Sequence, residues 1–531
     1  MSTSSTASCR QNDLRSPGGE VMARRLARDA PLFAAVDAGT TGARAIAFDL
    51  QGRQVGEARH PYRMVSPRPG WAEQDARDWA EGAVAALRQL AARSRIAGRI
   101  RAIGLTGQCP TMVPVGSDCQ PLRPGMLYRD NRAVAQARQM REAIGDRRMH
   151  ELTGHVAEAF HVGPKVLWLR QYEPAVFART SFILQPRDVV LHRLTGLART
   201  DETHANATLF FNLRERRWDA GLLAAFGIDA DLFPPVLAPW QVAAELPRQA
   251  ADELGLDPGM PVVVGAADSQ CAAFGAGVTG PGPVSEMAGA SSCLNSAVPE
   301  PLPDPRVTHY SHTIPGCYCT ELGVNTTGAA ISWAVRALGY RSYAELSADA
   351  ERGRRRLQRA TRRAGVSALA AAPLFLPYLG DGERDDPTAR AGFIGLSDRH
   401  GRPELAFAVI EGAALGVRSV LQVLAAAGAP LAELRVGGGG ARLNLSGQTK
   451  ADLLGHPVVH LDLDPAGFGA AMLAAAATGR GEQADESARA IRQRARRFVP
   501  SPSGSRFELP RAAWFDQVRA SAAVHEPRAP A

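Results

Sequence analysis

The stretch "AAVDAGTTGARAIAFDL", residues 34–50, joins two apolar runs through a short turn of glycines and threonines. The runs at 32–37 and 43–50 predict the two strands of a hairpin, and "RQVGEARHPY" at 53–62 predicts a third strand. Asp37 stands at the end of the first run, although a carboxylate is rarely buried without a partner. The strand pattern alone does not explain this charged group.

A helix and a further strand follow the three predicted strands. Within 75–94, four apolar residues recur at helical spacing: Trp79, Ala83, Leu87 and Leu90. The apolar run "RIRAIGLTGQ" at 99–108 then predicts the next strand. Antiparallel strands followed by a helix-to-strand crossover predict a mixed sheet covered by helices, and exclude a simple dinucleotide-binding unit at this point.

Length and composition indicate two globular domains. With 531 residues, 45% apolar and 21% charged, the chain exceeds the size of one ordinary core. The sequence holds no uninterrupted apolar run near the about 20 residues of a membrane helix, and residues 1–30 lack the apolar segment of a secretory signal. We expect a cytoplasmic protein with no membrane partner and a disordered tail at 1–30, which starts at Met1 or Met22.

The cysteines do not indicate a site for a metal bound by thiols, and the net charge does not indicate a nucleic-acid partner. The seven cysteines are scattered, apart from the close pair Cys317 and Cys319, as is typical of reduced thiols. A net charge of +8 would suit a nucleic-acid partner, but lysine occurs only at Lys165 and Lys450 and the arginine-rich runs lie in helix-like segments. We interpret these runs as solvated helix faces and expect no nucleic-acid partner.

The strand and turn pattern of the N-terminus returns in the second half. "GMPVVVGAADSQCAAFGAG" opens another strand-rich region, and "GPGPVSEMAGASSCLNSAV" at 280–298 predicts a strand, a glycine turn and a strand. Turn-rich residues separate the halves near 275–284. Later segments predict a helix at 403–427, a strand into "RVGGGG" and a helix at 444–454. The pattern predicts a pseudo-repeat of two domains.

Turns of glycine and hydroxyl residues are suited to phosphate. They present N–H groups and hydroxyls in a concave arrangement, and a carboxylate such as Asp37 can hold Mg²⁺ through water. "VSEMAGASSCL" repeats the pattern at 289–292, the four glycines of "RVGGGGAR" leave room for a flat base or ribose, and a second apolar strand ends abruptly at Asp268. "DAGTTG" alone favours a structural turn, but the combination predicts phosphoryl transfer. The sequence has no GxxxxGK[ST], HExxH, CxxC or GxSxG, and "GGGGAR" lacks the GxGxxG spacing.

Longer motifs carry a more specific signal. "AGFIGLSDRHGRPELAFAVIE" at 391–411 satisfies the C-terminal signature of a known family. "FHVGPKVLWLRQ" matches its N-terminal signature only partly: it keeps Phe160, Lys165, Trp168 and Leu169 but has Val162 where proline, serine or threonine is usual. Supporting matches are "LYRDNR" (127–132), "DETHANATLFFNLRERRWD" (201–219) and "LPYLGDGER" (376–384). Over 33–480 the chain resembles the FGGY carbohydrate kinases, which include xylulokinases and glycerol kinases within the actin-like ATPase superfamily.

The resemblance implies an α/β fold of two actin-like, ribonuclease H-like domains. Each is expected to be a mixed five-stranded sheet flanked by helices, with a cleft between the domains. The N-terminal domain, 31–278, would carry the first phosphate loop, the catalytic aspartate and most of the acceptor site. The C-terminal domain, 279–485, would carry the second phosphate loop and the adenosine site, followed by a partly disordered extension at 486–531.

The resemblance also implies roles for single residues. Asp37 is expected to organise Mg²⁺, and Asp268 to act as the catalytic base. ATP is expected to contact two loops and an adenosine segment: Gly39, Thr40, Thr41, Gly289, Ala290, Ser291, Gly438, Gly439, Gly440 and Asn444. Ala290 stands where threonine is common in the family. The substrate is expected beside Asp268 and a further set: Gln108, Cys109, Pro110, Tyr128, Asp130 and Phe160. Tyr128 and Phe160 could instead only pack the wall of the cleft.

The acceptor is less closely specified. After "LTGQ" the chain has Cys109, Pro110 and Thr111, where typical xylulokinases have Met-His-Gly and glycerol kinases have Arg-Glu-Thr. The leading expectation is an ATP-dependent kinase for a ketose, most simply a pentulose such as xylulose. The alternatives are a kinase for erythritol or glycerol and a non-catalytic actin-like nucleotide-binding regulator, against which the presence of Asp268 argues. A small-molecule sugar is the expected partner, and a homodimer is left open.

Overall fold

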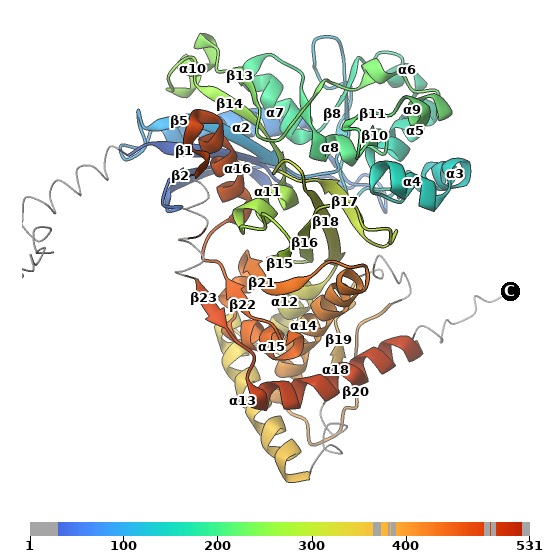
Figure 1. Ribbon diagram of the computed structural model, residues 1–531, viewed down its shortest axis with the longest axis vertical. Coiled ribbons are helices and arrows are strands. Elements are labelled where there is room, and N and C mark those ends of the chain that lie inside the picture. Colours follow the sequence, from blue (N-terminus) through green and yellow to red (C-terminus); the bar gives the residue numbers. More distant parts are fainter. Residues whose placement is uncertain are drawn as a thin grey trace, which may run out of the picture.

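The computed structural model describes residues 30–364, 373–380, 383, 389–482, 489 and 495–522. They form two stacked α/β domains, with the N-terminal sheet in the upper part of Figure 1 and the C-terminal sheet below it. The predicted tail, apart from residue 30, and the last residues of the predicted extension, 523–531, lie outside the described residues.

The N-terminal sheet is built around the first strand of the chain. Its order is β13 (Val242–Glu245), β14 (Pro261–Ala267), β5 (Ile100–Gly107), β1 (Leu32–Ala38), β2 (Gly42–Asp49) and β3 (Gln54–Pro61). All seven residues of β1 are buried, as expected for a strand covered on both faces. β1 pairs antiparallel with β2 and parallel with β5, so Asp37 lies opposite Arg44 on one side and Thr106 on the other. The predicted three-strand opening is confirmed.

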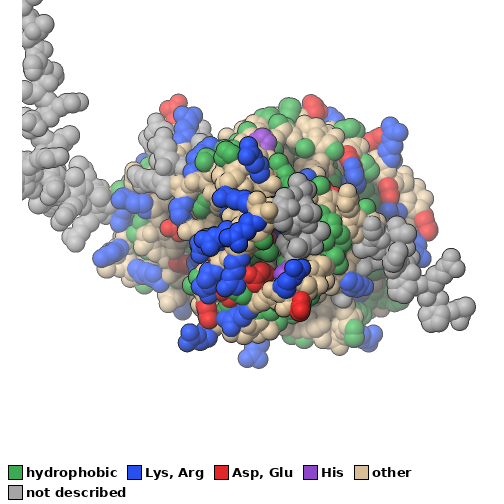
Figure 2. Space-filling model, turned by 90° about the horizontal axis from the view of Figure 1, so that it is seen from below, with side chains coloured by type: hydrophobic (Ala, Val, Ile, Leu, Met, Phe, Trp, Pro, Cys, Tyr) green, Lys and Arg blue, Asp and Glu red, His purple; other side chains and the backbone are tan. Residues whose placement is uncertain are grey.

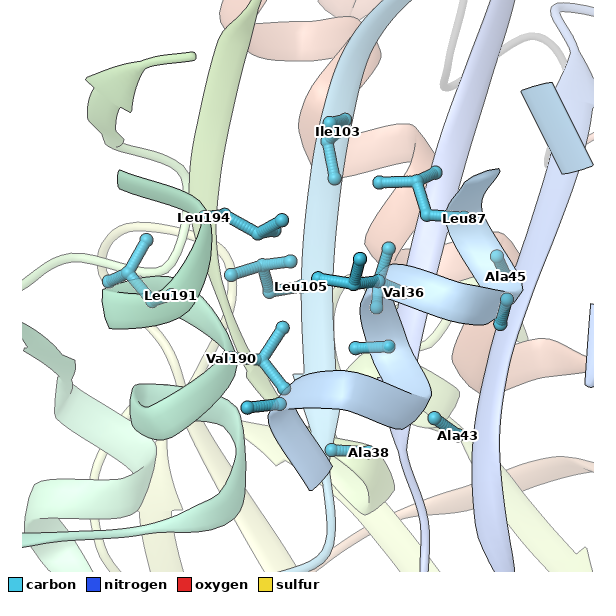
Figure 3. Close-up of a cluster of buried hydrophobic side chains, with 14 of the residues drawn as sticks. Val36, Ala38, Ala43, Ala45, Leu87, Ile103, Leu105, Val190, Leu191 and Leu194 are labelled. Carbon is cyan, nitrogen blue, oxygen red and sulfur yellow. The ribbon is translucent and has the colours of Figure 1, made fainter. Parts of the chain in front are cut away.

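Helices α2 (Ala76–Ala91), α7 (Pro186–Thr195) and α10 (Arg248–Leu254) pack together on the N-terminal domain. Asp75 caps α2, because its side chain accepts a hydrogen bond from the Arg77 N–H. The four residues predicted at helical spacing are all buried: Trp79, Ala83, Leu87 and Leu90. Figure 3 shows Leu87 and the α7 leucines beside Val36 and Leu105 of the sheet. Each such side chain contributes about 1.5–3 kcal/mol through burial.

The other face of this sheet is covered by two helices from distant parts of the chain, α11 (Asp268–Gly275) and α16 (Pro465–Ala475). α16 lies so close to β5 that a Cβ atom on Gly104 would be 2.0 Å from the Ala470 carbonyl oxygen. The segment predicted as the C-terminal domain, 279–485, thus contributes one helix to the N-terminal domain. Sequence order alone does not reveal this exchange.

A smaller lobe of short helices and strand pairs extends the N-terminal domain. Its helices are α3 (Val134–Ile144), α4 (Asp146–Thr153), α5 (Val162–Tyr172), α6 (Pro174–Phe177), α8 (Glu202–Asn206) and α9 (Ala220–Ala225). Its strand pairs are β4 (Glu73–Gln74) with β7 (Gly125–Met126), β6 (Val113–Val115) with β8 (Phe182–Leu184), β9 (Thr200–Asp201) with β12 (Val236–Leu237), and β10 (Phe211–Asn212) with β11 (Arg217–Trp218). The lobe has its own apolar core.

The C-terminal sheet repeats the plan of the first. Its order is β17 (Thr308–Ser311), β18 (Tyr318–Val324), β16 (Ser292–Val298), β15 (Gly282–Ala288), β21 (Leu431–Gly437), β22 (Val458–His460) and β23 (Arg496–Phe498). The series β22-β21-β15-β16-β18 corresponds to β14-β5-β1-β2-β3, so the predicted pseudo-repeat is confirmed. The sheets have six and seven strands rather than the predicted five, because β13, β17 and β23 add to the shared pattern at the sheet edges.

The helices of the C-terminal domain include a helix from the predicted extension. They are α12 (Thr327–Ala337), α13 (Tyr343–Ala364), α14 (Arg402–Ala426), α15 (Asn444–Leu454) and α18 (Pro502–Ala522), beside the pair β19 (Leu374–Leu376) and β20 (Gly392–Ile394). Arg511 of α18 is 0% exposed and forms an ion pair with the equally buried Glu411 of α14. Residues 495–522 therefore pack as an integral part of the domain, while the rest of the predicted extension, apart from residue 489, lies outside the described residues.

The first arginine-rich run forms part of a helix surface on α13, whereas Arg496–Phe498 of the second run form strand β23 and most of its other residues lie outside the described residues. Both lysines are buried, so the blue side chains gathered on the lower face in Figure 2 are arginines. α13 packs Leu346 and Leu357 inward and exposes its arginines except Arg354, and several of them pair with neighbouring acids, as Arg355 does with Glu351. α14 is long and apolar enough to cross a bilayer, but 78% of its most apolar window is buried within the protein. It is therefore a core helix.

Candidate active site

The first predicted phosphate turn, 39–41, directly follows Asp37. Asp37 is 4% exposed, and its Oδ2 atom accepts hydrogen bonds from Arg44 Nε at 3.1 Å and Nη2 at 2.6 Å. Its Oδ1 atom is buried without a hydrogen-bond partner among the described residues. A buried oxygen atom without a hydrogen bond lowers the stability of the fold unless a ligand binds to it. A carboxylate oxygen beside a phosphate loop fits Mg²⁺, which prefers oxygen ligands.

Arg44 connects Asp37 to the C-terminal half of the chain. Its Nη1 atom forms an ion pair with Asp464, whose Oδ1 atom caps α16 by accepting a hydrogen bond from Gly467 N at 3.1 Å. Burial and then the charge of Asp464 raise the pKa of Asp37, and Arg44 opposes this shift. Sequence reasoning missed the ion pair between Arg44 and Asp464, which spans 420 positions. The only signal in the sequence was for the other partner of Arg44, because the predicted hairpin brings Arg44 opposite Asp37.

Three side chains hold the main chain of the first turn. The Tyr62 hydroxyl donates to the Gly39 carbonyl at 2.5 Å, and Gln74 Nε2 donates to the Thr40 carbonyl at 2.6 Å. Gln108 Nε2 donates to Gln74 Oε1 at 3.0 Å, and Gln108 is only 1% exposed. Gln108, expected at the substrate, instead lies behind the loop, while the side chain of Thr41 is exposed.

The second predicted turn, Gly289 to Ser291, is exposed between β15 and β16. The start of α12 supports it, because Ala329 N donates to the Ala290 carbonyl at 2.8 Å. A Cβ atom on Gly328 would lie 1.9 Å from the Gly289 carbonyl oxygen, so only glycine permits this contact. The turn is therefore presented on a rigid helix start.

The glycine run at 438–440 packs against the same strand end. A Cβ atom on Gly440 would lie 2.4 Å from the Ala288 Cβ, and Gly438 has a φ of 80°, which favours glycine. Asn444, at the start of α15, is exposed and accepts a hydrogen bond from Arg496 Nη1. The second turn and the expected adenosine segment thus share one strand end, Ala288.

A buried ion pair lies beneath the second turn. Lys450 Nζ lies 2.7 Å from Glu286 Oε1, which also accepts a hydrogen bond from Ser292 Oγ at 2.7 Å. Glu286 is 1% exposed and Lys450 is 5% exposed. The carboxylate of this hairpin is neutralised, so no charge is left for a cation. Sequence reasoning missed Glu286 and Lys450.

Asp268 begins α11 directly after β14, and its Oδ1 atom accepts a hydrogen bond from Ser269 N at 2.8 Å. Burial, followed by the charges of Asp37 and Glu321, raises the pKa of Asp268 to about 7. A base is most effective when its pKa lies near the working pH. The environment of Asp268 therefore suits it to accept a proton from an alcohol.

The motif at 201–219 supports the strand end that carries Asp268. Ala267 N donates to Thr203 Oγ1 at 2.8 Å, and Thr203 Oγ1 donates to Asp201 Oδ2 at 2.6 Å. Asp201 is 0% exposed and also lies 3.0 Å from Arg187 Nη2. This chain of buried contacts fixes the residue before Asp268, and gives the sequence motif a positioning role.

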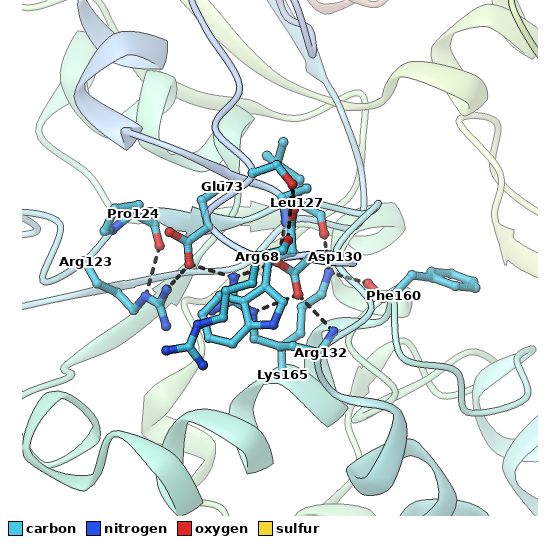
Figure 4. Close-up of polar contacts among 12 residues, drawn as sticks. Arg68, Glu73, Arg123, Pro124, Leu127, Asp130, Arg132, Phe160 and Lys165 are labelled. Atoms are coloured by element: carbon cyan, nitrogen blue, oxygen red, sulfur yellow. Dashed lines mark hydrogen bonds and ion pairs between the residues drawn. The ribbon is translucent and has the colours of Figure 1, made fainter.

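Asp130, expected at the substrate, lies inside an ion-pair network (Figure 4). It is 0% exposed; its Oδ1 atom accepts from Arg132 Nε at 2.8 Å and its Oδ2 atom from Ala72 N at 2.7 Å. Arg132 Nη2 also pairs with Glu73 at 2.6 Å. Both carboxylate oxygens of Asp130 are in use, so Asp130 supports the wall of the site and does not face a ligand.

Lys165 ties together the segments of two other expected substrate residues. Its Nζ atom donates to the carbonyls of Leu127 and Phe160, each at 2.7 Å (Figure 4). Burial lowers the pKa of Lys165 to about 7. Tyr128, next to Leu127, is 37% exposed and Phe160 is half-buried, so both rings remain available at the surface of the site.

Cys109 lies near Asp268, and Pro110 follows it in the chain. Cys109 is half-buried and Pro110 is buried. Burial, followed by surrounding carboxylates that include Asp268 and Glu321, raises the pKa of the Cys109 thiol well above its ordinary value. At neutral pH Cys109 is therefore an uncharged thiol beside Asp268.

A cavity of about 360 Å³ lies between the two domains. Phe160 and His161 line it from the N-terminal domain, and Glu321 and Tyr378 from the C-terminal domain. Glu321 Oε2 accepts a hydrogen bond from Ser269 Oγ at 2.5 Å, so the cavity adjoins the start of α11. Glu321 was not expected from the sequence, where it appears as an ordinary residue of a strand.

Both domains match known family models. Residues 32–275 match the FGGY family of carbohydrate kinases, N-terminal domain, and residues 285–478 match the C-terminal domain of the same family. These matches cover well over half of the chain.

Curated relatives and solved structures agree with the family models. The xylulose kinase of Bacillus subtilis strain 168 is 29% identical over 476 residues, covering 88% of this chain and 92% of that protein. The glycerol kinase of Delftia acidovorans is 30% identical over 522 residues, covering 92% of this chain and 98% of that protein. The crystal structure of xylulose kinase from Rhodospirillum rubrum matches with a TM-score of 0.80 at 29% identity, covering 92% of this chain and 99% of that one.

Proposed function

Because this chain belongs to the FGGY family of carbohydrate kinases, we propose that it transfers the γ-phosphate of ATP to a terminal hydroxyl of a ketopentose, with xylulose as the first candidate. As a member of the family the protein is a phosphotransferase that uses ATP as its donor. The observation that carries the finer proposal is Asp268, a carboxyl group with a pKa raised to about 7, whose neighbour Ser269 contacts Glu321 in the wall of the interdomain cavity.

The two turns and the glycine run form the proposed nucleotide site. Residues 39–41 and 289–291 would hold the phosphates through N–H groups and hydroxyls, and 438–440 with Asn444 would hold the adenosine. The supporting observations are the exposure of Thr41 and Ser291 and the backbone approach that Gly440 allows.

Asp37 would hold Mg²⁺ through its Oδ1 atom, which has no other partner among the described residues. When bound, the ion neutralises charge that develops on the phosphates. Arg44 keeps the opposite oxygen of Asp37 fixed and directs the free one away from the ion pair.

Asp268 would orient the terminal hydroxyl of the acceptor and take its proton as the new P–O bond forms. Phosphoryl transfer depends mainly on positioning and charge stabilisation, and a base adds about 10²–10⁴-fold. The contact from Thr203 to Ala267 keeps the carboxyl group of Asp268 in place for this step.

Cys109, Pro110, Tyr128 and Phe160 are the proposed acceptor contacts, whereas Gln108 and Asp130 would act as supports behind them. A neutral thiol and two aromatic rings suit the carbon skeleton of a sugar, which alternates apolar C–H and polar O–H groups. The many similar xylulose kinases support a ketopentose over other ketoses.

A second acceptor class deserves the same test. The similarity to glycerol kinases at 30% identity supports a shorter polyol such as glycerol or erythritol. The chain has Cys109 and Pro110 where those enzymes carry an Arg-Glu pair, which supports the ketopentose instead.

The decisive experiment measures ADP formation with purified protein, ATP and Mg²⁺ against a panel of pentuloses, hexuloses and C3–C5 polyols. We expect the highest kcat/KM with a pentulose. A maximum with glycerol or erythritol would favour the second class, and no turnover with any acceptor would contradict the proposal.

A further inference from the structure

Glu321 is one of several carboxylates that line the interdomain cavity, and the roles above do not use it. Glu321 lies on β18, between Asn295 of β16 and Thr308 of β17 in the strand register. Its side chain is half-buried and lines the same cavity as Phe160, which belongs to the proposed acceptor wall. Glu321 therefore faces the acceptor side of the site from the C-terminal domain.

One oxygen of Glu321 holds the catalytic segment. Its Oε2 atom accepts a hydrogen bond from Ser269 Oγ at 2.5 Å and another from Gln270 Nε2 at 3.1 Å. Ser269 and Gln270 directly follow Asp268. These contacts fix the orientation of the Glu321 side chain and place its carboxylate beside the base.

The other oxygen is available to a ligand. Within the part of the chain that the structure describes, Oε1 accepts no hydrogen bond, and no arginine, lysine or histidine forms an ion pair with the Glu321 carboxylate. A carboxylate is a strong hydrogen-bond acceptor for hydroxyl groups. In a partly desolvated site it also repels a second negative charge, because the local dielectric constant is low.

Building on the proposed function, we propose that Glu321 selects neutral acceptors: its Oε1 atom accepts a hydrogen bond from an acceptor hydroxyl, and its charge excludes acceptors that carry a carboxylate or phosphate group. The charges of Glu321 and Asp268 act on each other, and two arginines that line the cavity are already paired with acids, Arg141 with Asp146 and Arg306 with Asp304. A sugar bound between Asp268 and Glu321 would contact both domains, so the choice of acceptor involves the C-terminal domain as well as the N-terminal one.

The test compares Glu321→Gln and Glu321→Ala with the wild-type protein. The acceptors are xylulose and xylonate, a neutral ketopentose and a five-carbon acid. Glutamine keeps an oxygen that accepts a hydrogen bond but removes the charge, whereas alanine removes both. Asp146→Asn is the matched control, since Asp146 lines the same cavity but pairs with Arg141.

For each variant, kcat and KM are measured with both acceptors, and binding of both is measured by calorimetry with ADP present. We expect Glu321→Ala to raise the KM for xylulose about tenfold or more, the range for a hydrogen bond to a charged group, with a smaller change in kcat. Glu321→Gln should leave that KM within about threefold and raise kcat/KM for xylonate about tenfold or more. Asp146→Asn should change neither value.

The inference would be overturned if, in both Glu321 variants, the ratio of kcat/KM for xylulose to kcat/KM for xylonate stays within twofold of the wild-type ratio. A wild-type protein that binds xylonate as tightly as xylulose would also overturn it. Absence of turnover by the wild-type protein with every acceptor would instead overturn the proposed function. A thermal melt confirms that each variant is folded.

Discussion

Asp268 and Asp464 occupy corresponding places in the two halves of the molecule. Asp268 begins α11 after β14, and Asp464 caps α16 after β22, the strand that corresponds to β14 in the repeat. The two helices cross in close contact, since a Cβ atom on Gly469 would lie 1.9 Å from the Cys271 carbonyl oxygen. Equivalent positions have nevertheless received different environments.

The difference lies in the cation that each carboxylate meets. Asp464 forms an ion pair with Arg44, which also binds Asp37. Asp268 has Asp37 and Glu321 as its main charged neighbours, and burial together with these charges raises its pKa. The ion pair with Arg44 therefore gives Asp464 a structural role, whereas Asp268, whose pKa is raised, is the copy that we propose as the base.

Replacing the base should have the largest effect. We expect Asp268→Asn to lower kcat by about 10²–10⁴-fold, because the amide cannot accept a proton. Nucleotide binding, measured by calorimetry, should stay within a few-fold, and the melting temperature at pH 8 should not fall, since a buried negative charge has been removed. Asp462→Asn, at an exposed position near α16, is the control. Near-normal turnover of Asp268→Asn would contradict the assignment of the base.

Separating the two helices should have the next largest effect. Gly469→Ala places a methyl group against the Cys271 carbonyl, which lowers the free energy of unfolding by about 1–3 kcal/mol and disturbs Asp268 at the start of α11. Urea unfolding measures the stability and the kinase assay measures kcat. Gly481→Ala is the control, because a Cβ atom on Gly481 would lie 3.9 Å from its nearest neighbour, the Ala476 Cβ, which is an ordinary contact. Equal stability of both variants would show that the helices can move apart without cost.

The pH dependence of turnover tests the charge environment of Asp268. Its pKa is raised to about 7, and only the ionised form accepts a proton, so kcat/KM should rise through pH 7 and level above it. Below about pH 6, each unit should lower kcat/KM about tenfold. Initial rates between pH 5.5 and 9 provide the profile. A flat profile down to pH 5.5 would show that Asp268 titrates at an ordinary value.

Removing the charge of Asp464 should have the smallest effect. Asp464→Asn keeps a good helix cap but loses the ion pair with Arg44. Because this pair is partly buried, its loss should lower the free energy of unfolding by about 1–2 kcal/mol. Because Arg44 still binds Asp37, kcat should fall less than about threefold. Thermal melts and the kinase assay check both values, with Asp462→Asn again as the control. A loss of turnover as large as that of Asp268→Asn would remove the contrast between the two copies.

The sequence predicted the elements of the fold well, because each is governed by local patterns. The hairpin at 34–50, the helix at 75–94 and the helix at 444–454 all depend on the spacing of apolar residues, and the structure has them within two or three residues. The repeat was also visible, since both halves begin with strand, glycine turn and strand. The edge strands β13, β17 and β23 were missed because they are short and weakly patterned.

The site was predicted less completely. Asp37, Asp268 and the two turns could be named from motifs. Gln108 and Asp130 were assigned to the substrate in the same way, and the structure shows both buried and hydrogen-bonded to neighbouring side chains. Motif position does not tell which way a side chain points or whether a distant partner occupies it. The same limit hid Glu321, whose contact with Ser269 joins two domains.

The sequence by itself determined the family, the two-domain plan and the chemistry available at the strand ends, because apolar periodicity and contiguous motifs are local. Only the tertiary structure decided which carboxylates keep a free oxygen. Arg44 forms ion pairs with Asp464 and with one oxygen of Asp37, and Lys450 neutralises Glu286. Asp268 instead has its pKa raised by burial and by negatively charged neighbours. A carboxylate's pKa and reactivity depend on the charges and solvent around it, and those are brought together only when distant segments of the chain fold against each other.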